Sequence, residues 1–125
     1  MSRLEPCPSS PNCVSTLGEG SKKMEPIPFS VSADQARELL IQVLEERPRT
    51  EIVERGERYL HAVETSKLLR FQDDVELVID EETGLVHFRS ASRVGYSDLG
   101  VNRKRMEEIR AELEARLGES FSRAT

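Results

Sequence analysis

Residues 71–91 read FQDDVELVIDEETGLVHFRSA, and this is the stretch with the clearest strand pattern in the chain. In its first half the apolar side chains fall mainly on every second position, as in a strand with one buried face. The alternating set is Phe71, Asp73, Val75, Leu77 and Ile79. Residues 81–84 then form a turn sequence in which Gly84 can take a positive φ, and a second strand follows to Ala91. The stretch therefore predicts a β-hairpin.

Two more strands are predicted upstream of this hairpin. The segment 51–55 ends at Gly56, and the segment 59–65 is rich in residues that favour strands. The run at 27–31 could add an edge strand, because Pro28 lacks the N–H group that a central strand needs. The sheet is therefore expected to have four or five strands.

One helix is predicted on each side of these strands. Ser32 is placed to cap the first helix, Gln35 completes a capping box, and Pro48 ends the helix. Its apolar face comprises Ala33, Ala36, Leu39, Leu40, Val43 and Leu44. Asn102 is the expected N-cap of the second helix, and Gly118 is its expected end. The apolar stripe of that helix comprises Met106, Ile109, Leu113 and Leu117.

The expected element order is (β)-α-β-β-β-β-α. Short connections favour an antiparallel meander, and two helices with one apolar face each suit one side of it. We predict a single α+β domain with two layers, an antiparallel sheet of four or five strands and two helices on one face. It is expected to span residues 27–118, after an irregular leader at 1–26 that is rich in proline and serine and carries both cysteines. Residues 119–125 are expected to form a flexible tail.

The composition excludes several classes of protein. The chain has 125 residues, enough for one domain, and a net charge of −5. An acidic chain is a poor general binder of nucleic acid, because phosphate contacts need basic side chains. The apolar runs are too short to cross a membrane, and no signal segment opens the sequence. We expect no nucleic-acid partner, no membrane span, and a cytoplasmic location, or an exported or periplasmic one if an N-terminal leader was removed.

Opposite charges dominate two neighbouring segments. Residues 72–82 contain six acids and no base, whereas residues 89–105 contain five bases and one acid. In one interpretation these charges form a structural network across the strands. Its acids would be Asp73 and Asp74, and its bases Arg89 and Arg93. Asp73 lies on the apolar side of its strand, so its carboxylate would need an arginine partner, for which Arg70 is a further candidate.

In a second interpretation the segment after the last strand is a ligand site. It combines hydroxyl groups, forked guanidinium groups and glycines close to the expected start of a helix, where free N–H groups favour an anion. The candidate ligand-binding residues are Arg89, Ser90, Ser92, Arg93, Tyr96, Ser97, Asp98, Asn102 and Arg103, with Asp73 and Asp74 as supporting acids. Such a set could hold a carboxylate, a phosphate or a sulfate, or face a protein partner.

Two motifs resemble a known family. They are CPSSPNCVS at residues 7–15 and RSASRVGYSDLGVNR at residues 89–103, with shorter matches at 48–49, 59–62 and 71–76. Together they resemble the family called domain of unknown function 1499, over roughly residues 6–117. The resemblance implies a type of domain and no particular reaction. Members of that family often carry a signal or apolar segment before the cysteine motif, whereas only six residues precede Cys7 here.

The cysteines and histidines leave several possibilities open. Cys7 and Cys13 could form a disulfide in an oxidising compartment, or remain free thiols or bind a metal in a reducing one. Their five-residue spacer is wider than the usual spacing of zinc ligands. His61 and His87 would complete a Cys₂His₂ count, and both lie on predicted strands, where they could be neighbours across the sheet. We expect no metal and no cofactor.

The leading functional hypothesis is a non-enzymatic binding or assembly module that uses the polar segment before the last helix. Its partner would be a small anion or a protein. One alternative is a redox or metal-dependent enzyme based on Cys7 and Cys13, and another is a purely structural homodimer. Acyl transfer and nucleotide hydrolysis are not indicated, because the sequence has no recognisable nucleophile motif and no glycine-rich phosphate loop.

Overall fold

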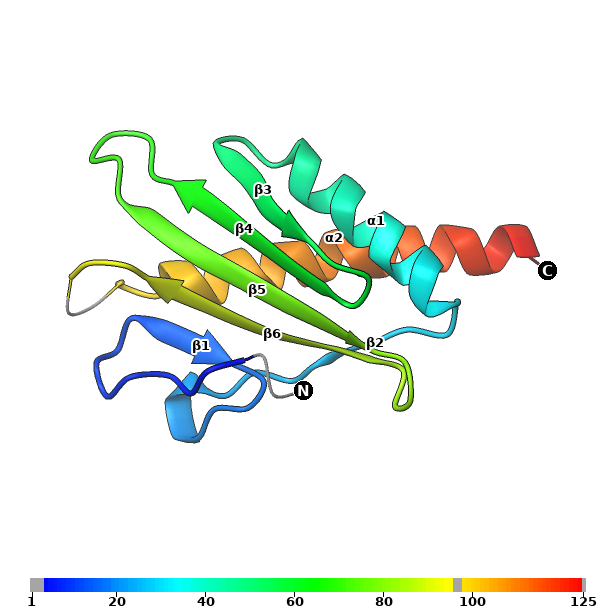
Figure 1. The fold of residues 1–125 in the computed structure, drawn as a ribbon, viewed down its shortest axis with the longest axis horizontal. Helices are drawn as coiled ribbons and strands as arrows, with labels where there is room; N and C mark the ends of the chain where they lie inside the picture. Colours follow the sequence, from blue (N-terminus) through cyan, green and yellow to red (C-terminus); the bar gives the residue numbers. More distant parts are fainter. Residues whose placement is uncertain (1–3, 96–97, 125) are drawn as a thin grey trace.

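The computed structural model describes residues 4–95 and 98–124, with side chains described up to residue 119. The described chain forms one sheet and two α-helices (Figure 1). In chain order the elements are β1 (Cys13–Ser15), the 3-10 helix η1 (Gly20–Lys22), β2 (Ile27–Pro28), α1 (Ala33–Glu46), β3 (Thr50–Arg55), β4 (Tyr59–Thr65), β5 (Gln72–Asp80), β6 (Leu85–Ser92) and α2 (Val101–Ala124). The predicted α+β class and the order of its helices and strands are confirmed.

The sheet has six strands, all paired antiparallel, and its main path is β1-β6-β5-β4-β3. The predicted hairpin of β5 and β6 lies at its centre, with Ile79 opposite Val86. β2 adds to the edge of β6, as the proline in that run suggested. β1 was not predicted and pairs with β6 through Val14 opposite Ser90. Three residues between turn-forming segments carry no strand pattern, so only the pairing with β6 makes them a strand.

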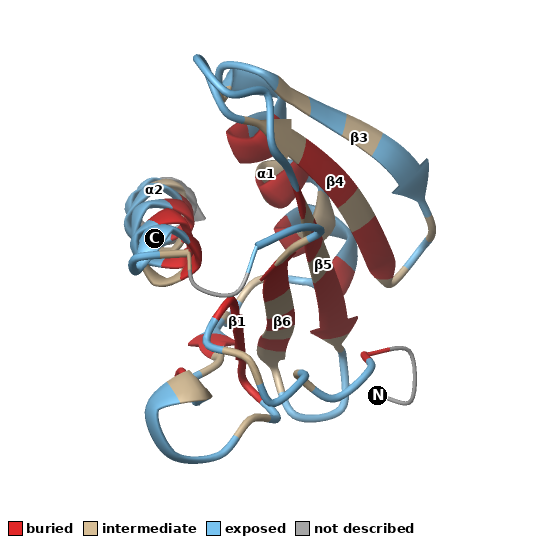
Figure 2. Cartoon of the chain, turned by 90° about the vertical axis from the view of Figure 1, so that its left-hand side faces the viewer, coloured by how far each residue is buried: buried red, intermediate tan, exposed pale blue. Residues whose placement is uncertain are grey.

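Both helices lie on one face of the sheet (Figure 2), and buried residues from the two layers form one core between them. The predicted apolar stripes of both helices meet there. The fully buried side chains of this core include Leu40 and Leu44 from α1, Met106, Ile109 and Leu113 from α2, and Leu60, Leu77 and Phe88 from the sheet. Each such side chain stabilises the fold by about 1.5–3 kcal/mol, so this layer supplies the main driving force.

The first helix begins and ends as expected, whereas the second does not. The Ser32 hydroxyl accepts a hydrogen bond from the backbone N–H of Gln35 at 3.1 Å. Asn102 is not the N-cap of α2, because it is the second helical residue and its side chain points into the interior. The carboxylate of Asp98 instead accepts from the N–H of Gly100 at 2.8 Å and of Asn102 at 3.1 Å.

The end of α2 also differs from the sequence expectation. The helix continues through Gly118 to Ala124, so most of the expected tail is helical. A glycine inside a helix costs only about 1 kcal/mol relative to alanine, and no proline follows it to stop the helix. Gly118 therefore does not act as a terminator.

The segment before residue 27 packs against the rest of the molecule. It contains β1 and η1, where an irregular stretch was expected, and several of its side chains are buried. Leu4 packs on Tyr59 and Val78, on the sheet face opposite the helices. The N-terminal segment thus covers part of the face that the helices leave open.

Candidate functional site

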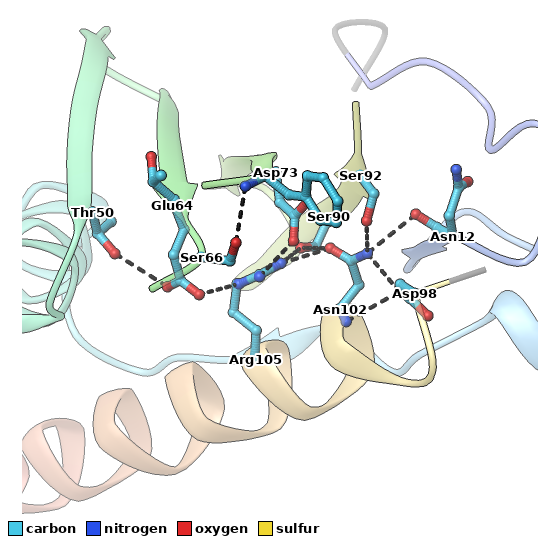
Figure 3. A network of polar contacts seen from close by, with 12 residues as sticks. Asn12, Thr50, Glu64, Ser66, Asp73, Ser90, Ser92, Asp98, Asn102 and Arg105 are labelled. Atoms are coloured by element: carbon cyan, nitrogen blue, oxygen red, sulfur yellow. Dashed lines mark hydrogen bonds and ion pairs between the residues drawn. The ribbon is translucent and has the colours of Figure 1, made fainter. Parts of the chain in front are cut away.

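An arginine of α2 is the centre of a buried polar network between the helix and the sheet (Figure 3). Arg105 is only 4% exposed. Its Nη2 donates to Oδ2 of Asp73 at 2.6 Å, and its Nε donates to Oε2 of Glu64 at 2.7 Å. The prediction that a buried Asp73 needs an arginine partner agrees with the structure, but the partner is Arg105.

The strand alternation explains why the expected partners were wrong. Asp73 faces α2, whereas Asp74 faces the other side of the sheet. Arg93 binds Asp74 there with two hydrogen bonds of 2.9 Å, as one of the predicted cross-strand pairs. Arg89 lies on the same outer face, where its Nη1 is 3.5 Å from Oε2 of Glu76. Arg105 of α2 reaches the carboxylate of Asp73 from the helix side.

Glu64 extends the network toward α1. Its Oε1 accepts from Nε of Arg47 at 2.9 Å and from the Thr50 hydroxyl at 3.1 Å, while Oε2 accepts from Arg105. Burial by itself raises the pKa of the Glu64 carboxyl, but hydrogen bonds and positive charge from Arg47 and Arg105 outweigh it and hold the pKa below its usual value. Glu64 is therefore a charged bridge between two arginines.

Asn102 joins this network to the loop that precedes α2. The residue is fully buried, and its Oδ1 accepts from Nη1 of Arg105 at 2.6 Å and from the Ser90 hydroxyl at 2.7 Å. Its Nδ2 lies within hydrogen-bond distance of Asn12 O, Ser92 Oγ and Asp98 Oδ2. The side chain thus connects α2, β6, the N-terminal segment and the loop.

A groove of about 520 Å³ opens beside this network. Its walls come from the tip of the β4–β5 hairpin, residues 66–71, and from the described part of the loop between β6 and α2, residues 93–95 and 98–100. Six large apolar side chains line it: Leu68, Leu69, Phe71, Val94, Leu99 and Val101. Asp73, Ser92 and Asp98 add oxygen atoms to the lining. The network and the groove therefore share residues.

Both walls of the groove contain a strained backbone position. Arg70 in the hairpin tip has φ 59° and Leu99 in the second loop has φ 54°. Side chains other than glycine rarely adopt this left-handed region, and such positions concentrate at functional sites. The third described non-glycine residue of this kind, Arg49, lies with Arg70 beside a smaller pocket on the outer face.

The structure brings together only part of the predicted ligand set. Ser90, Ser92, Asp98 and Asn102 join one network with Asp73. The arginines diverge, since Arg89 and Arg93 lie on the outer face and Arg103 donates to the backbone carbonyls of Ser21 and Lys23. Tyr96 and Ser97 lie outside the described residues. The three guanidinium groups therefore do not converge on one anion.

The sequence allowed the two histidines to be neighbours across the sheet. They are not, because β4 and β6 are not paired with each other. His61 on β4 lies opposite Glu76, whereas His87 on β6 lies opposite Val78. Nε2 of His61 is 2.7 Å from Oδ1 of Asp74. A bidentate hydrogen bond from Arg93 outweighs partial burial and, together with His61, lowers the pKa of the Asp74 carboxyl. The histidines thus belong to separate clusters.

His87 is held by the N-terminal segment. Its Nδ1 lies 3.0 Å from the hydroxyl of Thr16. Burial lowers the pKa of the His87 imidazole, and the negative charge of Asp80 offsets this only in part. The neutral imidazole is therefore the favoured form in the folded chain.

Cys7 and Cys13 form a disulfide with an S–S distance of 2.04 Å, so neither thiol is free. Among the described residues no group of three or more histidine, cysteine, aspartate or glutamate side chains is placed to hold a metal ion. Likewise, no helix in the described part of the chain is both long and apolar enough to cross a membrane. The disulfide is the one of the three cysteine interpretations that the structure contains.

Several residues of this region did not emerge from the sequence. Arg105 and Glu64 looked like ordinary surface charges of a helix and a strand. The leucines of the sequence SKLLRF, residues 66–71, offered a better signal, because consecutive apolar residues in an exposed turn are unusual unless they have a function. Leu68 is 87% exposed in the structure, and Leu99 is 92% exposed.

Comparison with known proteins identifies the family alone. No curated protein and no solved structure matches the chain. One family model, described as a protein of unknown function (DUF1499), matches residues 3–113. This range holds both cysteines, the complete sheet and most of α2, including the Arg105 network. The chain therefore belongs to the DUF1499 family.

Proposed function

We propose that this chain is a binding module and that its binding site is the groove between the hairpin tip and the β6–α2 loop. One observation carries the proposal. Eight large apolar side chains are exposed among the described residues, and six of them line this single groove. Isolated exposed apolar residues are normal on a protein surface, but a contiguous patch of them marks an interaction site.

The second support is the way the walls are held. Asp98 in one wall caps α2 and binds Asn102, and Asp73 at the base of the other wall binds Arg105. Both walls are thus attached to one turn of α2 by charge-assisted hydrogen bonds, of which the one between Asp73 and Arg105 is buried. A rigid site loses less conformational entropy when it binds its partner. The polar residues of the 89–103 segment therefore position the groove, while apolar residues contact the partner.

The volume and the lining indicate what the site can take. About 520 Å³ lies in the range of sites that bind small molecules or the side chains of a partner. The apolar walls favour an apolar group, and Asp73, Ser92 and Asp98 add a polar edge to the lining. This arrangement supports an apolar or amphipathic occupant over the small anion that the sequence suggested.

The proposal is tested with the neutral apolar dye N-phenylnaphthylamine, whose fluorescence rises when water is excluded. We expect the full chain to bind it, and the double variant Leu68→Ser/Leu99→Ser to bind at least about tenfold more weakly, because each leucine buried by the dye contributes roughly 1.5–3 kcal/mol. Both side chains are exposed, so the variant should unfold at the wild-type denaturant concentration.

Two exposed apolar residues outside the groove provide a matched control. Leu17 is 47% exposed and Val53 is 50% exposed. The variant Leu17→Ser/Val53→Ser also replaces two exposed apolar side chains by serine and should bind the dye as the wild type does. Equal dye affinity of both double variants would show that the groove is not the site.

We also propose that the protein works in an oxidising compartment. The Cys7–Cys13 disulfide supports this, because structural disulfides are rare where glutathione keeps thiols reduced. The test is alkylation of thiols with iodoacetamide in intact source cells, followed by mass spectrometry. Unmodified cysteines that become reactive only after reduction are expected, whereas alkylation of both without reduction would contradict the proposal.

A further inference from the structure

We infer that the partner of the groove is an anionic lipid surface, which the hairpin tip and the β6–α2 loop enter to a shallow depth. The inference rests on the proposed binding site and names its occupant. It is drawn from three features of the described residues 66–71, 93–95 and 98–101: how exposed the leucines are, where the cations lie, and how the backbone of the tip is closed.

The most exposed leucines lie in the two walls of the groove. Leu68 is 87% exposed, Leu69 is 70% exposed and Leu99 is 92% exposed. The hairpin tip and the loop project from the same end of the molecule, opposite the C-terminal end of α2 (Figure 1). A small molecule held between the walls would leave side chains this exposed largely in water. A broad apolar phase that meets the end of the molecule would cover all three.

Cations accompany these leucines. Lys67 and Arg70 flank Leu68 and Leu69, and no acid lies between residues 65 and 72. Neither cation forms an ion pair with a carboxylate among the residues that the structure describes. This local positive charge contrasts with the net charge of −5 of the whole chain. Lysine and arginine beside apolar residues match the phosphates of an anionic bilayer above its acyl region.

The same charges argue against a second copy of the chain. In a twofold contact through the hairpin tips, Lys67 and Arg70 would approach their own equivalents, and the tip itself has no acid to pair with them. Asp98 in the other wall already accepts hydrogen bonds from the N–H groups of Gly100 and Asn102. Like charges across an interface disfavour association. Charge complementarity therefore favours a surface of opposite sign.

Two hydrogen bonds close the backbone at the base of the tip. The N–H of Ser66 donates to the carbonyl of Phe71 at 2.8 Å, and the N–H of Phe71 donates to the Ser66 hydroxyl at 2.9 Å. An unpaired backbone group is costly to remove from water, so this pairing lowers the cost of bringing the base of the tip to the interface. The left-handed Arg70 makes this closed turn possible by reversing the chain just before Phe71.

The experiment is co-sedimentation of the full chain with vesicles. One set contains phosphatidylcholine only, and the other contains phosphatidylcholine with about one third phosphatidylserine as the anionic lipid. We expect binding to the anionic set, weaker binding as salt is raised, and little binding to the neutral set. The variant Lys67→Gln/Arg70→Gln should bind about 30-fold more weakly, because each cation near an anionic surface contributes about fivefold to affinity.

Two controls separate the contributions. The variant Lys23→Gln/Arg55→Gln also removes two exposed cations, one beyond η1 and one at the far end of β3, and it should bind as the wild type does. The variant Leu68→Ser/Leu69→Ser keeps every charge and should lose at least about tenfold in affinity. Equal binding of the two charge variants would overturn the role of the hairpin tip.

The remaining outcomes distinguish the inference from the proposed function. Dye binding without vesicle binding would overturn the lipid inference and leave the groove as a site for another partner. Equal binding to neutral and anionic vesicles would overturn the anionic specificity and with it the inference. A concentration-dependent dimer that Leu99→Ser abolishes, without vesicle binding, would assign the surface to a second copy. If the wild-type chain bound neither the dye nor the vesicles, the proposed function would be overturned as well.

Discussion

At the scale of single residues, the interior depends on one guanidinium group. Arg105 neutralises Asp73, shares Glu64 with Arg47, and donates to Asn102. Buried ion pairs rarely add much net stability, because both charges must leave water, but the removal of one partner leaves an uncompensated charge. Arg105 therefore fixes the relative position of α2 and the sheet more than it raises the total stability.

The variant Arg105→Met tests this role. It keeps the length of the side chain and removes its charge, so Asp73 becomes buried without a cation. We expect the free energy of unfolding to fall by about 3–5 kcal/mol in urea denaturation. Arg93→Met, which breaks a half-exposed pair with Asp74, should cost no more than about 1 kcal/mol. Equal losses in the two variants would contradict the central role of Arg105.

His87 gives the stability a pH dependence near neutrality. Its pKa in the folded chain lies below the ordinary value of about 6.5, because the ring is partly buried. As the pH falls below about 6.5, the unfolded chain takes up a proton that the folded chain does not, so the free energy of unfolding decreases until the folded pKa is passed. An NMR titration should give a midpoint below 6.5, and His87→Gln should flatten this part of the stability profile.

A separate loss of stability is expected in acid. The pKa values of Glu64 and Asp74 are lowered in the folded chain, so the stability that they contribute is present above their unfolded pKa near 4 and is lost as the pH falls through the folded values. A titration midpoint of His87 at or above 6.5 would refute the first effect and leave this second one untouched.

At the scale of elements, the start of α2 links secondary structure to the groove. Asp98 caps the helix through two backbone N–H groups and also lines the groove. Ser32 caps α1 in a comparable way, but at the other end of the layer and outside the groove. The two caps should therefore stabilise their helices by a similar amount, but only the cap at Asp98 should affect the groove.

The variants Asp98→Ala and Ser32→Ala separate these consequences. Each should lower the free energy of unfolding by about 1 kcal/mol, the usual cost of losing an N-cap. Only Asp98→Ala should also weaken binding of N-phenylnaphthylamine, because the β6–α2 loop loses its anchor. A fluorescence titration checks this, and equal dye affinity in both variants would mean that the loop keeps its position without the cap.

At the scale of the whole molecule, the N-terminal segment contacts both the outer face of the sheet and the loop before α2. On the outer face, Leu4 packs against Val78. At the β6–α2 loop, Nδ2 of Asn12 donates to the carbonyl of Gly95 at 2.8 Å. The disulfide between Cys7 and Cys13 cross-links the segment in this region. Residues 4–16 thus contact the outer face of the sheet, pair with β6 through β1, and support one wall of the groove.

Removal of the disulfide tests this arrangement. The double variant Cys7→Ser/Cys13→Ser should lower the free energy of unfolding by about 2 kcal/mol, as expected for a cross-link with a sequence separation of 6. Hydrogen exchange measured by mass spectrometry should become faster over residues 4–12 and stay unchanged in β4, β5 and β6. Unchanged exchange in the N-terminal segment would show that its packing alone holds it.

The sequence by itself determined the elements whose pattern is local. The period of two in residues 71–91 predicted β5 and β6, and the 3.6-residue period with a Ser32 cap predicted α1. It also indicated that Asp73 is buried with an arginine, and two family motifs identified the domain. The predictions of strands and helices depend on neighbours within a few residues, because side-chain pattern and backbone geometry are directly linked there.

Only the tertiary structure decided the rest, because it depends on residues far apart in the chain. The partner of Asp73 is 32 residues away on α2, and β1 becomes a strand only beside β6. Leu68 and Leu99 look like unrelated loop residues until the hairpin tip and the β6–α2 loop come together at one end of the sheet. Strand alternation places Arg89 and Arg93 on the outer face, so neither arginine lines the apolar groove that lies beside the buried polar network.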